Sequence, residues 1–379
     1  MTIPRTVFKE EHELFRKTVK AFIDREITPH YEAWEKQGHV SREVWRKAGA
    51  EGLLLTGIPT EYGGGGADFL SAAVMIEEMA KRIYAAPGFR LHSDIVAPYI
   101  LHYGSEDQKR QWLPKMATGE VVTAIAMTEP DTGSDLKNIR TTARRDGNEL
   151  VVNGAKTFIT NGGLADLIVV ATKTDTAAGA KGVSLVLVEA DRKGFRRGKN
   201  LKKIGQNAQD TAQLFFDDVR VPITNLLGQE GGGFVHLMQQ LPQERLISAV
   251  AAVATMEAAL QWTVEYTRER KMFGKTLADM QNTRFKLAEV KTEVTVARTF
   301  LDKCLELHVA GGLDAPTAAM AKWWTTELEG RVLDTCLQFF GGNGYMVEYP
   351  IARAFVDARV HRIYAGTTEI MKELVARTL

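Results

Sequence analysis

The feature that most constrains the fold of this chain is a double change in its hydrophobic pattern, near residue 121 and again near residue 230. On both sides of this central stretch, apolar residues recur every three or four positions. Phe15, Val19, Phe22 and Ile23 are an example, and this spacing is typical of helices packed along one face. Between the two changes lie short runs of β-branched residues separated by turn formers. The pattern therefore predicts an α+β fold: helices, then a β-domain, then helices.

The central segment predicts an antiparallel sheet. Its apolar runs are VVTAIAM, ELVVNG, TFIT, LIVVATK, VSLVLVE and AQLFFDDVRV. Pairs such as Asn153-Gly154 and Asn161-Gly162 between these runs favour tight hairpin turns. A doubly wound parallel sheet would need long helices between the strands, and this segment contains no such pattern.

We expect three units: an N-terminal helical domain over residues 1–120, the β-domain over 121–230 and a C-terminal helical bundle over 231–379. In the last unit the periodicity predicts long helices over 233–270, 281–310 and 315–340. Asp314 and Pro316 form a start signal for the third helix, and the glycines from Gly341 end it.

Charge and composition argue against several classes of protein. Lys plus Arg number 48 and Asp plus Glu number 47, a net charge of +1, whereas nucleic-acid binders usually carry a basic excess. Two cysteines, Cys304 and Cys336, match neither a disulfide framework nor a metal-binding spacing. Polar residues interrupt the most apolar stretch, 246–262, so we expect no membrane span. The N-terminal residues show no apolar signal core, from which we expect a cytoplasmic location.

Five turn-rich motifs contain groups that could bind a ligand. The loop MTEPDTGSD (127–135) exposes N–H groups and hydroxyls. In KTFITNGG (156–163), strand alternation puts Phe158 and Thr160 on one face, where they could flank a flat heteroaromatic cofactor. The motif RERKMFG offers Arg270 and Phe273. QFFGGNGY (338–345) and RIYAGTTEI (362–370) offer glycines and a helix start. Each motif taken alone also fits a surface turn, a packed aromatic or an ordinary helix end.

Glu244 in LPQERLISAV is a candidate proton acceptor. It belongs to an apolar helical stretch, and adjacent positions such as Arg245 do not face it on a helix. No basic side chain lies one turn away, where the neighbours are Gln240, Leu241, Ile247 and Ser248. Burial would raise the pKa of this carboxyl and suit it to proton abstraction. The alternative is a partner supplied by another element.

Taken in order, these motifs resemble those of the acyl-CoA dehydrogenase family along essentially the whole chain. The segments that carry the resemblance are MTEPDTGSD, NGAKTFITNGG, AQDTAQLFFDDVRVP, ERKMFGK, QFFGGNGYMVEYP and IYAGTTEIMKELVAR. LPQERL and DARVHRIYAGTTEIMKELVAR are most similar to the long-chain branch. The resemblance implies a C-terminal four-helix bundle, a homotetramer and FAD bound between the β-domain and the bundle.

The resemblance also implies a set of contacts to FAD and to an acyl-CoA substrate. Met127 and Thr128 would contact the pyrimidine edge of the flavin, Phe158 would cover one face, and Thr160 would bond to N5. The groups expected to meet the FAD of a neighbouring subunit are Arg270, Phe273, Gln281, Gln338, Gly341 and Gly342. Those expected near the cofactor pyrophosphate are Thr367 and Glu369. The substrate contacts would be Ser134, Arg245, Tyr364 and Gly366, and Ser134 is expected near the cofactor as well.

Two departures from the family pattern bear on the mechanism. Many members carry the catalytic Glu directly before the Gly-Thr of the last motif, but this chain has Ala365 there, which cannot accept a proton. In the long-chain and isovaleryl branches the base lies on the long bundle helix, at the place of Glu244. Ala365 would still supply its backbone N–H to the thioester oxygen. The second departure is Asp131, which adds a carboxylate to the loop that holds Ser134.

The implied reaction is α,β-dehydrogenation of an acyl-CoA to the trans-2-enoyl-CoA. The α-proton would pass to Glu244, the β-hydrogen as hydride to flavin N5, and the electrons to an electron-transferring flavoprotein. We expect a long straight-chain substrate. Short or branched acyl-CoA, and an oxygen-using acyl-CoA oxidase or monooxygenase of the same fold, stay open as alternatives. The neutral charge balance disfavours a non-enzymatic, nucleic-acid-binding relative.

Overall fold

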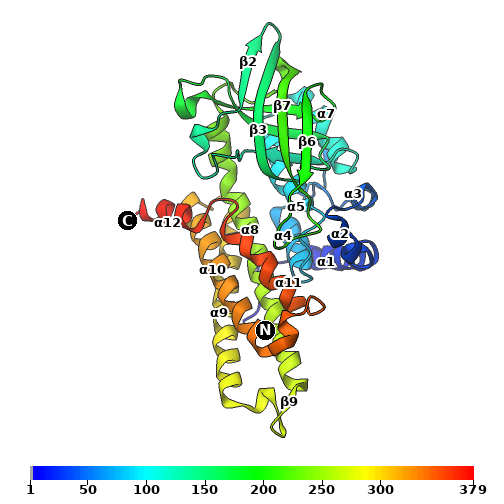
Figure 1. Cartoon of the computed structure of the whole chain (residues 1–379), viewed down its shortest axis with the longest axis vertical. Coiled ribbons are helices and arrows are strands. Elements are labelled where there is room, and N and C mark those ends of the chain that lie inside the picture. Colours follow the sequence, from blue (N-terminus) through cyan, green and yellow to red (C-terminus); the bar gives the residue numbers. More distant parts are fainter. Residues whose placement is uncertain (1–2) are drawn as a thin grey trace.

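In the computed structural model, which describes residues 3–379, the β-sheet domain lies at one end of the molecule, and the N-terminal helices lie beside α8 of the helical bundle that extends to the other end (Figure 1). Helix α1 shows why this first part is helical. His12, Arg16, Val19 and Phe22 form one buried face, and acidic residues in the first turn favour the helix start. The helices of this part are α1 (Glu10–Phe22), α2 (Tyr31–Gln37), α3 (Arg42–Ala50), α4 (Phe69–Ala80), α5 (Phe89–Leu91), α6 (Ala97–Tyr103) and α7 (Glu106–Ala117).

The central part is a sheet of eight strands in the order β6-β7-β3-β2-β4-β5-β8, with β1 beside β4. Its strands are β1 (Thr123–Ala126), β2 (Thr142–Asp146), β3 (Glu149–Thr160), β4 (Leu167–Lys173), β5 (Val183–Glu189), β6 (Phe195–Asn200), β7 (Thr211–Pro222) and β8 (Leu226–Leu227). The predicted antiparallel pairing holds for β2–β3, β4–β5 and β6–β7. The β1–β4 pair is parallel, as is the single β2–β4 contact. Turn residues identify hairpins between consecutive strands, but they carry no signal for pairing between strands that are distant in sequence.

The third part contains three long helices that match the predicted ranges within a residue. They are α8 (Gly233–Glu269), α9 (Gln281–Val309) and α10 (Ala315–Phe340), and the shorter α11 (Pro350–Asp357) and α12 (Thr368–Ala376) pack against α10. The Asp314 side chain accepts a hydrogen bond from the Thr317 N–H and caps α10, and the left-handed Gly341 ends it. A small hairpin, β9 (Lys271–Met272) and β10 (Lys275–Thr276), joins α8 to α9.

Two of the three hydrophobic cores cross the predicted boundaries between units. One core joins Val96 and Ile100 of the first part to Leu167 and Val169 of the sheet. Another joins Leu70 of α4 to α8, α9 and α10. The boundaries at residues 120 and 230 therefore stay predictions, because the packing does not divide where the sequence pattern changes.

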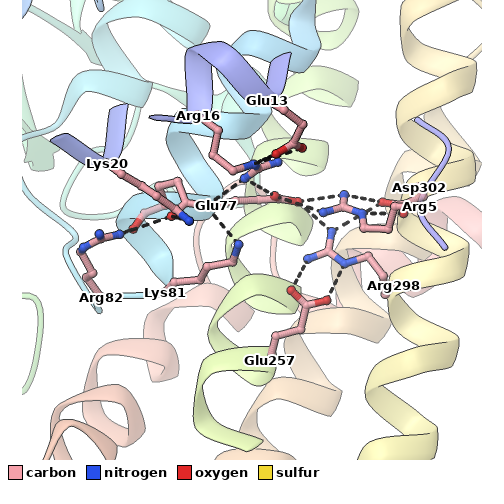
Figure 2. A network of polar contacts seen from close by, with 11 residues as sticks. Arg5, Glu13, Arg16, Lys20, Glu77, Lys81, Arg82, Glu257, Arg298 and Asp302 are labelled. Carbon is pink, nitrogen blue, oxygen red and sulfur yellow. Dashed lines mark hydrogen bonds and ion pairs between the residues drawn. The ribbon is translucent and has the colours of Figure 1, made fainter. Parts of the chain in front are cut away.

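A buried network of ion pairs ties the first part to the bundle (Figure 2). Glu77 on α4 is fully buried and meets Arg5, Arg16 and Arg298, with N–O distances of 2.9 Å to each. Arg298 on α9 also pairs with Glu257 of α8 at 2.8 Å. Burial alone would raise the pKa of Glu77, but the Arg298, Arg5 and Arg16 guanidinium groups lower it to about 2. The carboxylate thus stays charged and holds α4 against the bundle.

Within the described residues, α8 alone is long and apolar enough to cross a membrane by length and hydropathy. Of its most apolar window, 72% is buried inside the protein, against α4, α9 and α10. It is the central helix of the bundle.

Candidate active site

A cavity of about 530 Å³ lies where the sheet, α8 and the turn before α12 meet, a volume typical of ligand-binding sites. The first helical part also contributes to its walls, through Arg90, Leu91 and Ile95. Ten of the predicted site residues line it: Met127, Thr128, Ser134, Phe158, Thr160, Glu244, Arg245, Tyr364, Ala365 and Gly366. Residues from three motifs and from α8 are therefore brought together around one space.

Glu244 is the buried carboxylate of this cavity. Burial raises its pKa to about 7, although a hydrogen bond from Tyr99 and the nearby Arg245 guanidinium act to lower it. The Tyr99 hydroxyl, on α6, donates to Oε1 of Glu244 at 3.0 Å. The partner that the sequence left open thus comes from another helix. A carboxyl with a pKa near 7 can accept a proton at neutral pH.

Arg245 follows Glu244 and is also buried. Sequence reasoning placed its side chain on another side of the helix, but both side chains line the cavity. Burial lowers the pKa of Arg245, and the Glu244 carboxylate partly offsets that effect. Within residues 3–379 its Nε makes no hydrogen bond. Its guanidinium is therefore a donor with capacity to spare for a polar ligand.

The turn before α12 has an unusual backbone. Ala365 has a φ of 53° and Gly366 a φ of 97°, so two successive residues lie in the left-handed region. Such a conformation costs an alanine about 1 kcal/mol, and it is commonly kept at functional sites. The N–H of Ala365 makes no hydrogen bond to any part of the chain that the structure describes. A free backbone donor at the cavity wall suits a carbonyl oxygen that gains negative charge.

The loop that carries Met127 and Thr128 is held from behind by a buried lysine. Lys156 donates to the Met127 carbonyl and to Oε1 of Glu129, both at 2.9 Å. The Thr157 N–H donates to the Thr128 carbonyl at 2.9 Å. These bonds fix the loop that follows β1, and Met127 and Thr128 of this loop line the cavity.

Phe158 reaches the cavity because of a bulge in β3. The register with β7 shifts between Lys156 and Ile159, and Phe158 itself has a φ of 59°. The bulge interrupts the strand alternation that predicts Phe158 and Thr160 on one face. Both side chains nevertheless line the cavity. Phe158 is 66% exposed.

An exposed aromatic ring, a fixed loop edge and the Thr160 hydroxyl around one cavity are what the flat end of FAD needs. The residues present therefore fit the flavin end of the cofactor. Met127, Thr128, Phe158 and Thr160 would hold it.

Ser134 lines the cavity without a hydrogen bond to the described chain, while Asp131 does not line it. Oδ2 of Asp131 pairs with Nη1 of Arg140 at 3.2 Å on an exposed face. The added carboxylate is thus directed to a neighbouring arginine.

A second group of predicted site residues lies elsewhere. Phe273, 90% exposed, is in the β9–β10 hairpin, at the end of the molecule opposite the sheet (Figure 1). The rest of the group are at the end of α8, the start of α9 and the end of α10, namely Arg270, Gln281, Gln338, Gly341 and Gly342. None of them lines the cavity of its own chain.

Thr367 and Glu369 lie at the start of α12, next to the cavity but not in its wall. The Thr367 hydroxyl accepts a hydrogen bond from the Ile370 N–H at 3.4 Å and caps the helix. Glu369 is exposed, and hydrogen bonds from its own backbone N–H and from the Thr367 hydroxyl lower its pKa.

Two buried side chains at the site were not predicted. Tyr99 contacts Glu244 from 145 positions away, and no local pattern indicates such a pair. Lys322 on α10 donates from Nζ to the Gly366 carbonyl at 2.7 Å. A signal for Lys322 exists in the sequence, because a lysine within the apolar stretch TAAMAKWW is out of place on a buried helix face. Within residues 3–379 no cluster of His, Cys, Asp and Glu is arranged to hold a metal ion.

Family models match the three parts of the chain. The N-terminal domain of acyl-CoA dehydrogenase matches residues 9–120, the middle domain matches 124–219 and the C-terminal domain matches 231–379.

Among curated proteins, the long-chain specific acyl-CoA dehydrogenase, mitochondrial, of Rattus norvegicus is 52% identical over 377 residues, which cover 99% of this chain and 88% of that protein. The acyl-CoA dehydrogenase of Bacillus subtilis is 37% identical, with 98% of both proteins covered. Among solved structures, acyl-CoA dehydrogenase from Geobacillus kaustophilus has a TM-score of 0.97 at 49% identity, covering 99% of both chains.

A glutaryl-CoA dehydrogenase from Mycobacterium smegmatis in complex with FADH2 has a TM-score of 0.90 at 28% identity, covering 98% of this chain and 95% of that one. Its reduced flavin agrees with the cavity described above, whose walls fit the same group. The three matched domains, the relatives over nearly the whole length and the site geometry lead to one conclusion: the chain belongs to the acyl-CoA dehydrogenase family and is an FAD-dependent acyl-CoA dehydrogenase.

Proposed function

We propose that this enzyme converts long-chain acyl-CoA to trans-2-enoyl-CoA, with Glu244 as the base that removes the α-proton. The observation that carries this proposal is the pairing, in one cavity, of a buried carboxyl whose pKa is about 7 with the free N–H of Ala365. FAD, when bound, supplies the hydride acceptor for the β-hydrogen. Loss of a proton from Cα and a hydride from Cβ leaves the new double bond.

The chain's own residues supply the proton chemistry. Glu244 takes the α-proton on its carboxylate while the Tyr99 hydroxyl holds Oε1 in place. The Ala365 N–H donates to the thioester oxygen and so stabilises the charge that grows there. In comparable sites, removal of one such donor raises the activation free energy by roughly 3 kcal/mol. The Arg245 guanidinium contributes further positive potential at the cavity wall.

The experiment is an anaerobic titration of the FAD-loaded enzyme with a long-chain acyl-CoA. Wild-type flavin should lose its visible absorption, whereas Glu244→Gln should keep its flavin and slow this bleaching by about 100-fold or more. Glu265→Gln, an exposed carboxylate on the same helix, is the matched control and should bleach normally. Normal bleaching in Glu244→Gln would show that another group is the base.

Two observations support a long-chain substrate. The relative from Rattus norvegicus, named as long-chain specific, is 52% identical over nearly the whole chain. The cavity lining also includes the apolar side chains of Leu91, Ile95, Phe234, Met238, Leu241 and Ile247. Turnover measured on a series of straight and branched acyl-CoA thioesters tests the choice. If turnover is fastest with short or branched acyl chains, the long-chain assignment is wrong. The role of Glu244 as the base is not affected by that result.

We infer that the active assembly is an oligomer, in line with the homotetramer implied by the family. Arg270 and Phe273 fit a cofactor contact in the family pattern, but they lie outside the cavity of their own chain. A second copy would bring them to it. Mixing Glu244→Gln subunits with Arg270→Ala subunits tests this, since only a hybrid holds one site with both groups intact. Recovery of about a quarter of the wild-type activity after random 1:1 exchange supports the inference, because half of the sites keep Glu244 and half of those meet an intact Arg270. No recovery from subunits shown to exchange contradicts it.

We propose an electron-transferring flavoprotein as the acceptor, which is the acceptor that the family resemblance implies. A similar structure, of TM-score 0.93, carries the description electron transferring flavoprotein of Acidaminococcus fermentans. Substrate oxidation should need an added flavoprotein or dye. Rapid peroxide formation with oxygen as the sole acceptor would instead identify an acyl-CoA oxidase.

A further inference from the structure

Lys322 is buried in the middle of α10, directly behind the turn that carries Ala365. Its side chain is fully buried, and Nζ donates to the Gly366 carbonyl at 2.7 Å. This bond joins the bundle to a turn in which two successive residues hold left-handed conformations. It is the kind of contact that can keep a strained turn in one conformation.

Lys322, like the buried Lys173 and Arg245, lacks the carboxylate partner that several other buried cations of the described chain have. Lys156 lies 2.9 Å from Glu129, and Arg16 and Arg298 each lie 2.9 Å from Glu77. Within the residues that the structure describes, no carboxylate lies within 4.0 Å of the Lys322 ammonium. A neutral donor could bond to the Gly366 carbonyl at a lower desolvation cost. A retained charge therefore points to an electrostatic role at this turn.

The charged groups nearest to Lys322 come from three helices. Burial lowers its pKa to about 8, and the Arg245 guanidinium on α8 lowers it further. Glu327 on α10 and Glu369 on α12 act in the opposite direction. Lys322 and Arg245 thus place positive potential on the side of the cavity where Ala365 and Gly366 lie, and Glu244 is the carboxylate close to Arg245.

We propose that Lys322 is a positioning residue for the dehydrogenation. It holds the Gly366 carbonyl so that the Ala365 N–H faces the cavity, and it adds positive charge behind that donor. The proposal rests on the function proposed above. When the α-proton moves to Glu244, that carboxylate becomes neutral and negative charge appears on the thioester oxygen. Fixed cations at the turn favour this shift of charge.

The test separates positioning from structure by using the FAD-loaded enzyme and a 3-thiaacyl-CoA. This analogue cannot be oxidised, and its α-carbanion gives a long-wavelength absorption band with oxidised flavin. Lys322→Met should lower kcat by about tenfold or more while KM changes by less than about threefold. It should also lower the fraction of bound analogue that is deprotonated. Lys322→Arg, which keeps a charged donor, should restore most of both signals. Lys322→Gln, a neutral donor, replaces the Met variant if that does not fold and should show the same losses.

A neighbouring buried position on α10 provides the control. Thr325 is fully buried, and its hydroxyl donates only to the backbone carbonyls of Ala321 and Lys322 within its own helix, so Thr325→Val, which leaves the Lys322 side chain in place, should leave both signals unchanged. Full deprotonation of the analogue by a folded Lys322→Met variant would overturn the role of Lys322, even if kcat fell. Glu244→Gln is run in the same assay and should abolish the band. If it does not, the proposed function fails, which is a result distinguishable from failure of the Lys322 role.

Discussion

The Tyr99 hydroxyl donates to Oε1 of Glu244 at 3.0 Å, and both side chains are buried between α6 and α8. The contact has two consequences for the base. It fixes the carboxylate on the cavity wall, and it stabilises the charged form against the desolvation that raises its pKa to about 7. The strength of the base is thus set across an interface between two parts of the chain.

Removal of this hydrogen bond should shift the pH dependence of turnover. In Tyr99→Phe the ionised form of Glu244 loses a donor, so its pKa should rise above about 7. The base must be ionised to work, so the acid limb of kcat should move to higher pH, by about one unit. Activity at neutral pH should fall and recover in alkaline buffer. Tyr103→Phe is the control because the Tyr103 hydroxyl donates to Gln239 instead. An unshifted acid limb in Tyr99→Phe would contradict this account.

The carboxylate at the centre of Figure 2 should contribute strongly to stability. Glu77→Gln leaves Arg16 and Arg298 buried without their shared counter-charge. We expect a loss of about 3–5 kcal/mol in the free energy of unfolding, measured by chemical denaturation. Glu32→Gln breaks an exposed pair with Lys36 and should cost less than about 1 kcal/mol. Equal losses in the free energy of unfolding for the two substitutions would show that the buried network stabilises the fold no more than an exposed ion pair does.

The same network predicts a pH dependence of stability. The pKa of Glu77 falls from its usual 4.5 to about 2 in the folded protein. The stabilisation is therefore fully present above pH 4.5 and is lost as the pH falls through about 2. The stability gap between wild type and Glu77→Gln should stay constant from neutral pH down to about 5 and narrow below it. If this stability gap instead widened in acid, the pKa of Glu77 would be raised on folding and not lowered.

Phe158 should matter for the cofactor and not for the fold. It is 66% exposed, so Phe158→Ala should change the unfolding free energy of the FAD-free protein by about 0.5 kcal/mol or less. Loss of the ring should weaken FAD binding about tenfold, since a stacking aromatic contributes roughly 1 kcal/mol beyond the area it buries. Flavin fluorescence titration gives the affinity and thermal melting gives the stability. Destabilisation of the FAD-free protein with unchanged flavin affinity would assign Phe158 to the core.

The parts of the fold that the sequence predicts are those set by local chemistry. Asp314 and Gly341 bound α10 because a cap and a left-handed glycine act within a few residues. The parallel β1–β4 pair and the Tyr99–Glu244 contact depend on groups far apart in the chain, and no local pattern carries them. The bulge at Phe158 is intermediate: its residue was predicted for the site, but the shift in register that turns it there was not.

The shared cores have a consequence for recombination between relatives. Leu167 and Val169 of β4 pack in one core with Val96 and Ile100 of the first part. A chimera that exchanged residues 121–230 alone would pack a core face from one parent protein against a core face from the other parent. Each would need to be repacked to native density, at a cost of about 1–3 kcal/mol for every mismatched site. Crossover points that keep both faces of a core from the same parent should therefore yield stable hybrids, although such points do not coincide with the places where strands give way to helices.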